Sequence, residues 1–344
     1  MIPHISESSA RLLRPPRHRI VFERSFARAT LRPAVATMTS FLHPEPPHSY
    51  LPAFHVRTRR TAHPRAPIAL ALRLSRALLA VSAVAALVAV AWPRIFRDPA
   101  SYAGNALGTY VVVLIVALPM LAYAMRAAAR GSLRAHFVWL GSVCYLLYAS
   151  VLASFSLQFN ALFLVYVASL SLSVWSLVAL VGCIPADELP GRVSARLPAR
   201  GIGLYLIGIA VAFAALWLMD VLPAMLTGEV PDSLRGTTLP TNAVQVLDFG
   251  FTLPLCAAAG VWLMRRRPWG ILLSGGLLVF LVLEAVSVAV DQWFGQRADP
   301  TVPTAVIAVF ALLAVVGALP MFAFLNSIDA PRRSERRARR APDR

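Results

Sequence analysis

Two long apolar runs joined by three consecutive arginines restrict the fold of this chain more than any other feature. The first run is VLDFGFTLPLCAAAGVWLM and the second is ILLSGGLLVFLVLEAVSVAV. Each has about 20 residues, the length that an α-helix needs to cross the hydrocarbon core of a bilayer. The link RRRPWG places Arg265, Arg266 and Arg267 in a short turn, which is typical of a cytoplasmic loop. The pattern therefore predicts a transmembrane hairpin with its turn in the cytoplasm.

The same alternation of apolar runs and short polar links extends over most of the chain. A hydrophobic content of 58% with only 14% charged residues is typical of integral membrane proteins and excludes an ordinary soluble domain. We therefore predict an all-α fold, a polytopic transmembrane helix bundle. Its eight spans are expected at residues 68–92, 107–125, 137–154, 161–183, 202–218, 246–264, 269–290 and 302–325.

The arginines alternate between the two sides of this predicted bundle. Three links on one side carry three arginines each, and the residues after 331 carry seven, whereas the other side holds only Arg94, Arg97, Arg235 and Arg297. Because cytoplasmic segments are enriched in basic residues, both termini are expected in the cytoplasm. All 33 basic residues are arginine, a bias typical of GC-rich genomes, so we expect the plasma membrane of a bacterium.

The two ends of the chain lack apolar runs. Residues 1–66 hold eleven arginines, many prolines and six of the seven histidines, so a disordered cytoplasmic extension is expected. A transit peptide is a second interpretation, although the acids and prolines argue against an amphipathic targeting helix. Translation from Met38 is a third, and it would remove residues 1–37. Residues 327–344 are expected to form a disordered basic tail, which leaves 67–326 as the transmembrane domain.

A net charge of +17 does not predict nucleic-acid binding here, because the arginines lie in tails and short links instead of on one folded face. The expected partner is the lipid bilayer, with anionic lipid headgroups as candidate ligands of the basic tails. No cofactor is expected. No metal site is expected either, since Cys144, Cys183 and Cys256 show no CxxC spacing and no histidine lies within a span.

Glu284 is the one acid that lies well inside an apolar run, about 10 Å from the outer end of its predicted helix. Asp291 follows two turns later on the same face, and Asp248 and Asp220 lie at the outer ends of the two preceding spans. These four acids could form an externally open vestibule that attracts a cation or takes up a proton. Alternatively, the aspartates are interfacial caps and Glu284 bonds to neighbouring helices.

The fourth predicted span has one small, hydroxylated face, formed by Tyr166, Ser169, Ser173 and Ser176 at intervals of three and four residues. Such a face allows close helix packing, and a polar permeation stripe is the alternative. Trp139 is expected at the inner interface, where its indole N–H would stay wet.

Two Leu-Pro pairs, at Pro119 and Pro254, are each followed by an arginine-rich turn and then by Trp and Gly. We expect local kinks at both prolines. The resemblance predicts a parallel repeat of four plus four helices, or it is a chance similarity between Leu-rich helices.

Enzyme motifs such as HExxH, GxSxG and GxxxxGK are absent from the sequence. An intramembrane hydrolase would have to use Glu284 with Asp248 or Asp291, so an enzyme is not the favoured interpretation. The favoured function is transport of a small solute, coupled to a cation or a proton. The alternative is a non-catalytic membrane scaffold or sensor that acts through helix packing and its basic tails.

The runs QFNALFLVYVA and VLDFGFTLPL, the latter shortly followed by RRRPWG, resemble those of multi-pass integral membrane proteins of GC-rich bacteria to which no activity is assigned. The resemblance covers residues 68–325 and not the amino-terminal extension. It implies a membrane location and a helical fold, and it carries over no catalytic or binding residue.

Overall fold

The structure is a computed structural model that describes residues 66–301 and 303–328. Within these ranges the regular elements are helices, apart from one isolated β-bridge between Val193 and Ile328. Eight helical segments are long and apolar enough to cross a membrane, so the prediction of an eight-span, all-α membrane protein is confirmed. The predicted extension before residue 66 and the tail after residue 328 lie outside the described residues.

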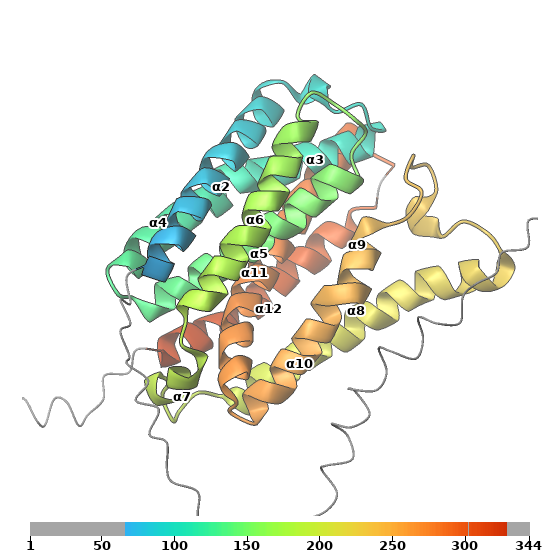
Figure 1. The fold of residues 1–344 in the computed structure, drawn as a ribbon. Coiled ribbons are helices and arrows are strands. Elements are labelled where there is room, and N and C mark those ends of the chain that lie inside the picture. Colours follow the sequence, from blue (N-terminus) through green and yellow to red (C-terminus); the bar gives the residue numbers. More distant parts are fainter. Residues whose placement is uncertain (1–65, 302, 329–344) are drawn as a thin grey trace, which may run out of the picture. The chain divides into compact units, whose positions relative to one another are not determined.

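Six of the spans are single helices (Figure 1). They are α2 (Ala66–Ala91), α5 (Leu133–Phe155), α6 (Phe163–Cys183), α8 (Ala199–Thr227), α11 (Pro268–Ala298) and α12 (Ala305–Ser327). The other two spans are each divided by a π-helical turn. The second consists of α3 (Ala100–Val112), η3 (Val113–Ala117) and α4 (Leu118–Ala129), and the sixth of α9 (Ala243–Leu247), η6 (Asp248–Thr252) and α10 (Leu253–Met264).

Both π-helical turns lie directly before a Leu-Pro pair. The N–H of Leu118 donates to the carbonyl of Val113, and that of Leu253 donates to the carbonyl of Asp248, so each bond spans five residues instead of four. Proline has no N–H to donate and its ring crowds the carbonyl four residues earlier, and the wider turn relieves this conflict. The two Leu-Pro pairs therefore share a local geometry as well as a sequence.

The spans are longer than predicted at one end of α3 and α11. The second span begins at residue 100 instead of 107, and the seventh ends at 298 instead of 290. Both extensions carry polar residues, which an apolar-run criterion excludes. They are helical because they pack on each other: a Cβ on Gly104 would lie 2.8 Å from the Cα of Gly295, and one on Gly108 would lie 2.5 Å from the Cα of Asp291.

Helix α11 lies at the centre of the bundle and packs against α3, α5, α10 and α12 (Figure 1). On one side of it, α2 packs on α6, and α6 packs on α5. On the other side, α8 packs mainly on α10 and meets α12 over a short stretch only. The helices on one side of α11 therefore pack extensively on one another, whereas those on the other side, at α8, make fewer contacts.

The links between spans gather at two ends of the bundle. We call one the arginine end, because nine arginines lie there in links or in the first or last turns of the helices: Arg126, Arg130, Arg134, Arg192, Arg196, Arg200, Arg265, Arg266 and Arg267. We call the other the long-loop end, after residues 228–242, which include η5 (Asp232–Leu234). The short elements η4 (Ala186–Glu188) and α7 (Leu189–Arg192) belong to the arginine end, and η2 (Pro93–Ile95) belongs to the long-loop end.

Hydrogen bonds join separate links at each end. At the arginine end, the guanidinium of Arg266 donates to the carbonyls of Ala195 (3.1 Å) and Leu197 (3.3 Å). At the long-loop end, the backbone N–H of Gln158 donates to Asp98 over 3.0 Å.

The expectation that the indole N–H of Trp139 stays wet is wrong. Its side chain is fully buried within the bundle, and its indole nitrogen donates to Ser75 Oγ on α2 over 3.0 Å. A serine on a neighbouring helix replaces the water that an indole N–H otherwise needs.

Candidate functional site

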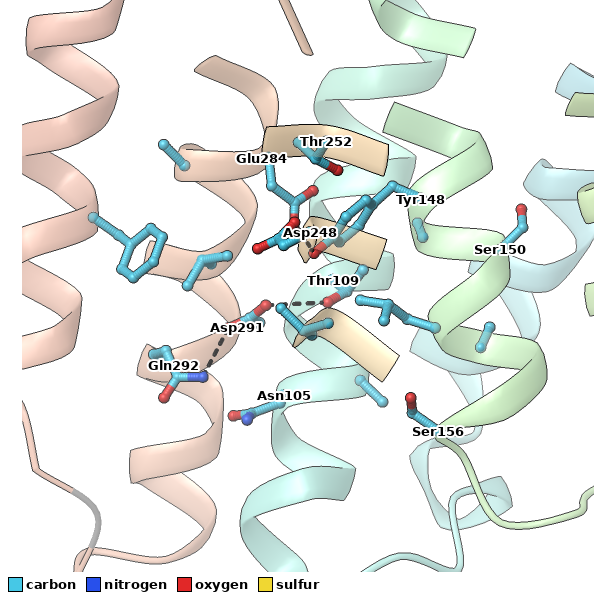
Figure 2. Close-up of a pocket in the computed structure, with 18 of the residues that line it drawn as sticks. Asn105, Thr109, Tyr148, Ser150, Ser156, Asp248, Thr252, Glu284, Asp291 and Gln292 are labelled. Carbon is cyan, nitrogen blue, oxygen red and sulfur yellow. Dashed lines mark hydrogen bonds between the residues drawn. The ribbon is translucent and has the colours of Figure 1, made fainter. Parts of the chain in front are cut away.

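A cavity of about 640 Å³ lies in the half of the bundle toward the long-loop end. Its walls come from α3, α5, α6, α8, α11 and α12, together with the sixth span around η6. Three of the four acids that the sequence singled out line it, namely Asp248, Glu284 and Asp291 (Figure 2). Its described lining residues include no arginine, lysine or histidine. The cavity therefore brings together three acidic side chains without a basic residue among its described lining residues.

Asp248 is the first residue of η6 and is buried, with 7% of its surface exposed. Each of its carboxylate oxygens accepts one hydrogen bond. The Tyr148 hydroxyl on α5 donates to Oδ1 over 3.2 Å, and the Trp217 indole on α8 donates to Oδ2 over 2.9 Å. Asp248 is thus fixed by donors from two other spans.

Asp291 lies on α11 at a close contact of that helix with α3. Thr109 Oγ1 donates to its Oδ2 over 3.4 Å, and the neighbouring Gln292 amide donates to Oδ1 over 3.3 Å (Figure 2). Gly108 allows this contact, because a Cβ there would overlap the Asp291 backbone. The short distance between the two helices places Thr109 within reach of the carboxylate.

Glu284 is half-buried and lies two turns before Asp291 on the same side of α11, facing the cavity (Figure 2). Within the described part of the chain, no hydrogen bond or ion pair holds its carboxylate. Ser287, between the two acids in sequence, instead points to α5 and accepts a 2.9 Å hydrogen bond from the Tyr145 hydroxyl. Glu284 is therefore the one acid of the three that keeps its full capacity to bind a ligand.

Asp220, the fourth predicted acid, is not among the lining residues. It accepts hydrogen bonds from the Gln245 amide (2.7 Å) and from the backbone N–H of Ser233 (3.2 Å). The Tyr102 hydroxyl on α3 donates to the carbonyl of Ser233 over 3.3 Å. Asp220 thus fastens the long loop to the ends of α8 and α9, which is the structural role that the sequence left open.

Aromatic side chains form much of the cavity wall. Tyr110 and Tyr166 stack with their ring centroids 6.0 Å apart, and Tyr148 lies against Phe280 at 5.6 Å. The Tyr166 hydroxyl interacts with Asn160 and Tyr110, whereas the buried Ser169 hydroxyl has no hydrogen-bond partner among the described residues. The wall therefore combines apolar rings with a hydroxyl group that is free to bind.

The hydroxylated face of α6 is divided between two environments. Tyr166 and Ser169 line the cavity. Ser173 and Ser176 are fully buried further along the same face, on a helix that packs against α2 and α5. Half of the predicted face thus faces the cavity, and the other half lies in a helix contact.

Asp98, in the link between α2 and α3, is a further acid at the long-loop end. One of its oxygens accepts the bond from Gln158, and the other is buried without a partner. Burial raises the pKa of Asp98 above its ordinary value of 3.8, although the Gln158 N–H acts in the opposite direction. Sequence reasoning did not single out this residue.

Other polar residues of the cavity were also missed. Asn105 and Gln292 lie on the polar ends of α3 and α11, which the predicted spans left out, and Thr109 lies within the predicted second span but was not singled out. One signal could have found them: Gly104 and Gly108 form a GxxxG spacing, which marks a close helix contact in membranes. Tyr148 and Trp217 carry no such signal, because their contact with Asp248 depends on how separate helices pack.

The chemistry of the site is that of a carboxylate-lined, partly aromatic cavity. The described residues contain no group of three or more His, Cys, Asp or Glu side chains arranged to hold a metal ion. Comparison with protein-family models, with curated proteins and with solved structures finds no match to this chain, so the resemblance drawn from its sequence receives no family assignment.

Proposed function

We propose that this multi-pass membrane protein binds a small cationic solute in the cavity and carries it across the bilayer, with Glu284 exchanging a proton for the solute. Asp248 and Asp291 lie beside it as further acidic groups of the same cavity. The membrane is the bacterial plasma membrane, and the cavity is on its outer side.

The observation that carries this proposal is the charge of the cavity. Three carboxylates line one space among apolar helices, and its described lining contains no basic residue. An ionised acid in a membrane interior is costly unless a cation, a proton or water compensates its charge. A bound cation compensates it directly, and a proton does so when the cation is absent. The cavity is thus suited to alternate between the two.

Glu284 is the acid best suited to that exchange. Asp248 accepts hydrogen bonds from Tyr148 and Trp217, and Asp291 accepts them from Thr109 and Gln292. These bonds stabilise the ionised forms of the two aspartates. No such donor faces Glu284 within the described residues, so its charge depends most directly on what occupies the cavity.

The alternative function, a scaffold or sensor, requires a closely packed bundle and acts through the basic tails. A cavity of about 640 Å³ lined by Glu284 is not expected in a closely packed bundle. The sparse contact of α8 with α12, and the π-helical turns in two spans, favour a bundle that changes its packing. Such a change is what alternating access requires.

Liposomes that contain the full chain test the proposal. Uptake of radiolabelled methylammonium, tetraethylammonium, sodium and rubidium would be followed, with pyranine inside the vesicles to report lumenal pH. We expect uptake of at least one of these cations together with proton release from the lumen. Glu284→Gln should abolish both signals while the helical circular dichroism and the elution volume stay unchanged.

Glu229→Gln is the matched control, because Glu229 is an exposed acid of the long loop that lies outside the cavity lining. Its uptake should equal that of the unaltered protein. Equal uptake by a folded Glu284→Gln variant would contradict the role given to Glu284. Absence of uptake for every probe, in vesicles shown to contain folded protein, would favour the scaffold.

A further inference from the structure

We infer that the solute is an organic ammonium ion with an aromatic body, and not a bare metal ion. This inference rests on the proposed function, since it names the chemical class of the occupant of the same cavity. It follows from the size of the cavity, the arrangement of its acids and the chemistry of its walls.

The cavity is much larger than an inorganic ion requires. Its volume of about 640 Å³ lies within the range of roughly 300–1,000 Å³ that is usual for sites of small organic ligands. Most of its lining surface is apolar, although about half of its lining residues carry a polar side-chain group. A ligand that fills this space must itself be largely apolar, because burial of that surface is what stabilises such complexes.

The acids are placed to bind one ammonium group and not to enclose a metal ion. Asp248 and Asp291 already accept hydrogen bonds from protein donors, and Glu284 and Asp291 are about 10 Å apart along α11. The described residues provide no metal-binding group of three. One unengaged carboxylate, that of Glu284, remains as the direct counter-ion for a single positive charge.

Aromatic rings lie close to this carboxylate. Phe280 is one turn before Glu284 on α11, and it packs against Tyr148, whose hydroxyl bonds to Asp248. An ammonium group is attracted to the faces of such rings as well as to a carboxylate. Phe280 and Tyr148 therefore provide a cation–π contact next to the charge of Glu284.

The part of the wall that α6 contributes offers a second, independent indication of an organic ligand. Ser169 is 5% exposed and lines the cavity, and its buried hydroxyl has no hydrogen-bond partner among the described residues. Buried hydroxyls without a hydrogen bond are costly, and a ligand can supply the missing partner. The occupant should thus carry a hydrogen-bonding group on its body, away from its ammonium end.

Binding to the detergent-solubilised full chain tests this inference. The probes are benzyltrimethylammonium, its neutral carbon isostere neopentylbenzene, tetramethylammonium, sodium and calcium. Isothermal titration calorimetry would give the affinities, and Trp217 fluorescence would report occupancy, since its indole lines the cavity. We expect benzyltrimethylammonium to bind at least about tenfold more tightly than each of the other probes.

Two variants assign the binding to the cavity. Glu284→Gln should weaken benzyltrimethylammonium at least about tenfold, because it removes the counter-charge. Phe280→Leu should weaken benzyltrimethylammonium several-fold more than tetramethylammonium, because it removes the ring but keeps an apolar side chain. Phe322→Leu is the control: Phe322 lies on α12, is 58% exposed and does not line the cavity, and its change should leave all affinities unaltered.

The outcomes separate this inference from the proposed function. Sodium or calcium binding that depends on Glu284, without competition by benzyltrimethylammonium, would overturn the organic-cation inference and leave cation transport standing. Equal affinity for neopentylbenzene would also overturn it, since charge would then play no part. Binding of benzyltrimethylammonium through Glu284 in a protein that moves no cation into liposomes would support the ligand class and overturn transport.

Discussion

The indole nitrogen of Trp217 donates a 2.9 Å hydrogen bond to Asp248 Oδ2, and this bond joins α8 to the π-helical turn of the sixth span. Helix α8 otherwise packs mainly on α10, which is the part of the same span toward the arginine end. Phe213, one turn before Trp217, meets Phe310 of α12 with a centroid distance of 6.0 Å. The position of α8 at the cavity thus depends on a few side-chain contacts, and the bond from Trp217 is a polar one among them.

Replacing Trp217 by phenylalanine should loosen this wall of the cavity. Asp248 would lose the indole donor while the Tyr148 hydroxyl stays, and loss of a hydrogen bond to a buried carboxylate costs about 1–3 kcal/mol. We expect a lower thermal unfolding midpoint, faster hydrogen exchange in the part of α8 near residue 217, and weaker binding of benzyltrimethylammonium. Trp175→Phe, which alters a 58% exposed side chain on α6, is the control and should change none of these. An unchanged exchange rate in α8 would show that the bond does not hold the helix.

Gly108→Ala should separate α3 from α11. The added Cβ would lie 2.5 Å from the Cα of Asp291, and a backbone atom cannot move aside as a flexible side chain can. Overpacking of this kind costs about 1–3 kcal/mol and should also break the bond from Thr109 to Asp291. The matched control is Gly208→Ala on α8, where no atom lies within 4 Å of the new Cβ. Thermal unfolding in detergent should show a loss for Gly108→Ala alone, and equal midpoints for the two variants would contradict the close contact.

Asp98→Asn should stabilise the protein at neutral pH and have no effect in acid. Burial raises the pKa of Asp98 in the folded state, so the folded chain binds a proton more tightly than the unfolded chain does. Folding therefore becomes less favourable as the pH rises from the ordinary value of 3.8 through the folded pKa. Asparagine is neutral throughout and keeps an oxygen for the Gln158 N–H. Unfolding midpoints of the two proteins should coincide near the lowest pH and diverge above it, with the asparagine variant higher.

Binding of a permanently charged cation in the cavity should weaken as the pH is lowered. Protonation of Glu284, Asp248 or Asp291 removes negative charge, and the other titratable residues described in the lining are tyrosines, which stay neutral in this range. Titration of benzyltrimethylammonium between about pH 5 and 8 measures the effect. Glu284→Gln should leave a flatter profile from the two aspartates. A profile in the unaltered protein as flat as that of the variant would contradict proton competition at Glu284.

The orientation of the bundle can be tested directly by single cysteines in a cysteine-free background. A cysteine at Arg265 should be labelled only from the cytoplasmic side, and one at Gly236 in the long loop only from the outside. The physical reason is the concentration of arginines at one end, which stay in the cytoplasm during insertion. Labelling with the opposite sidedness would invert the bundle and place the cavity on the cytoplasmic side.

Much of the fold could be predicted because a bilayer imposes simple rules. Apolar runs long enough to span it form helices, since every backbone group must bond within its own segment. This gave eight spans and located Glu284 inside one of them. The ends of α3 and α11 were missed for a related reason: Asn105 and Gln292 are polar, and they are helical because the two helices pack on each other and not because they are apolar.

The candidate site was predictable only in part. An acid inside an apolar run is visible in the sequence, so Glu284, Asp248 and Asp291 could be selected from their positions along the spans. Their different surroundings could not. Asp220 accepts hydrogen bonds from Gln245 of α9 and from Ser233 of the long loop. Trp139 was expected at a wet interface, but its indole nitrogen donates to Ser75. Each of these contacts joins segments that are distant in sequence, and no local periodicity encodes them.

The sequence by itself determined that this is a membrane protein of eight helices with an acid deep in the seventh, because hydrophobicity and length are properties of single segments. Only the tertiary structure decided that Asp248 and Asp291 share one cavity with Glu284. It also decided that Tyr148 and Trp217 donate hydrogen bonds to Asp248, and that Glu284 has no hydrogen-bond partner among the described residues. The physical reason is that a cavity exists between helices. Its size and charge follow from how closely α3, α8 and α11 pack, which glycines and single hydrogen bonds set and which no single segment specifies.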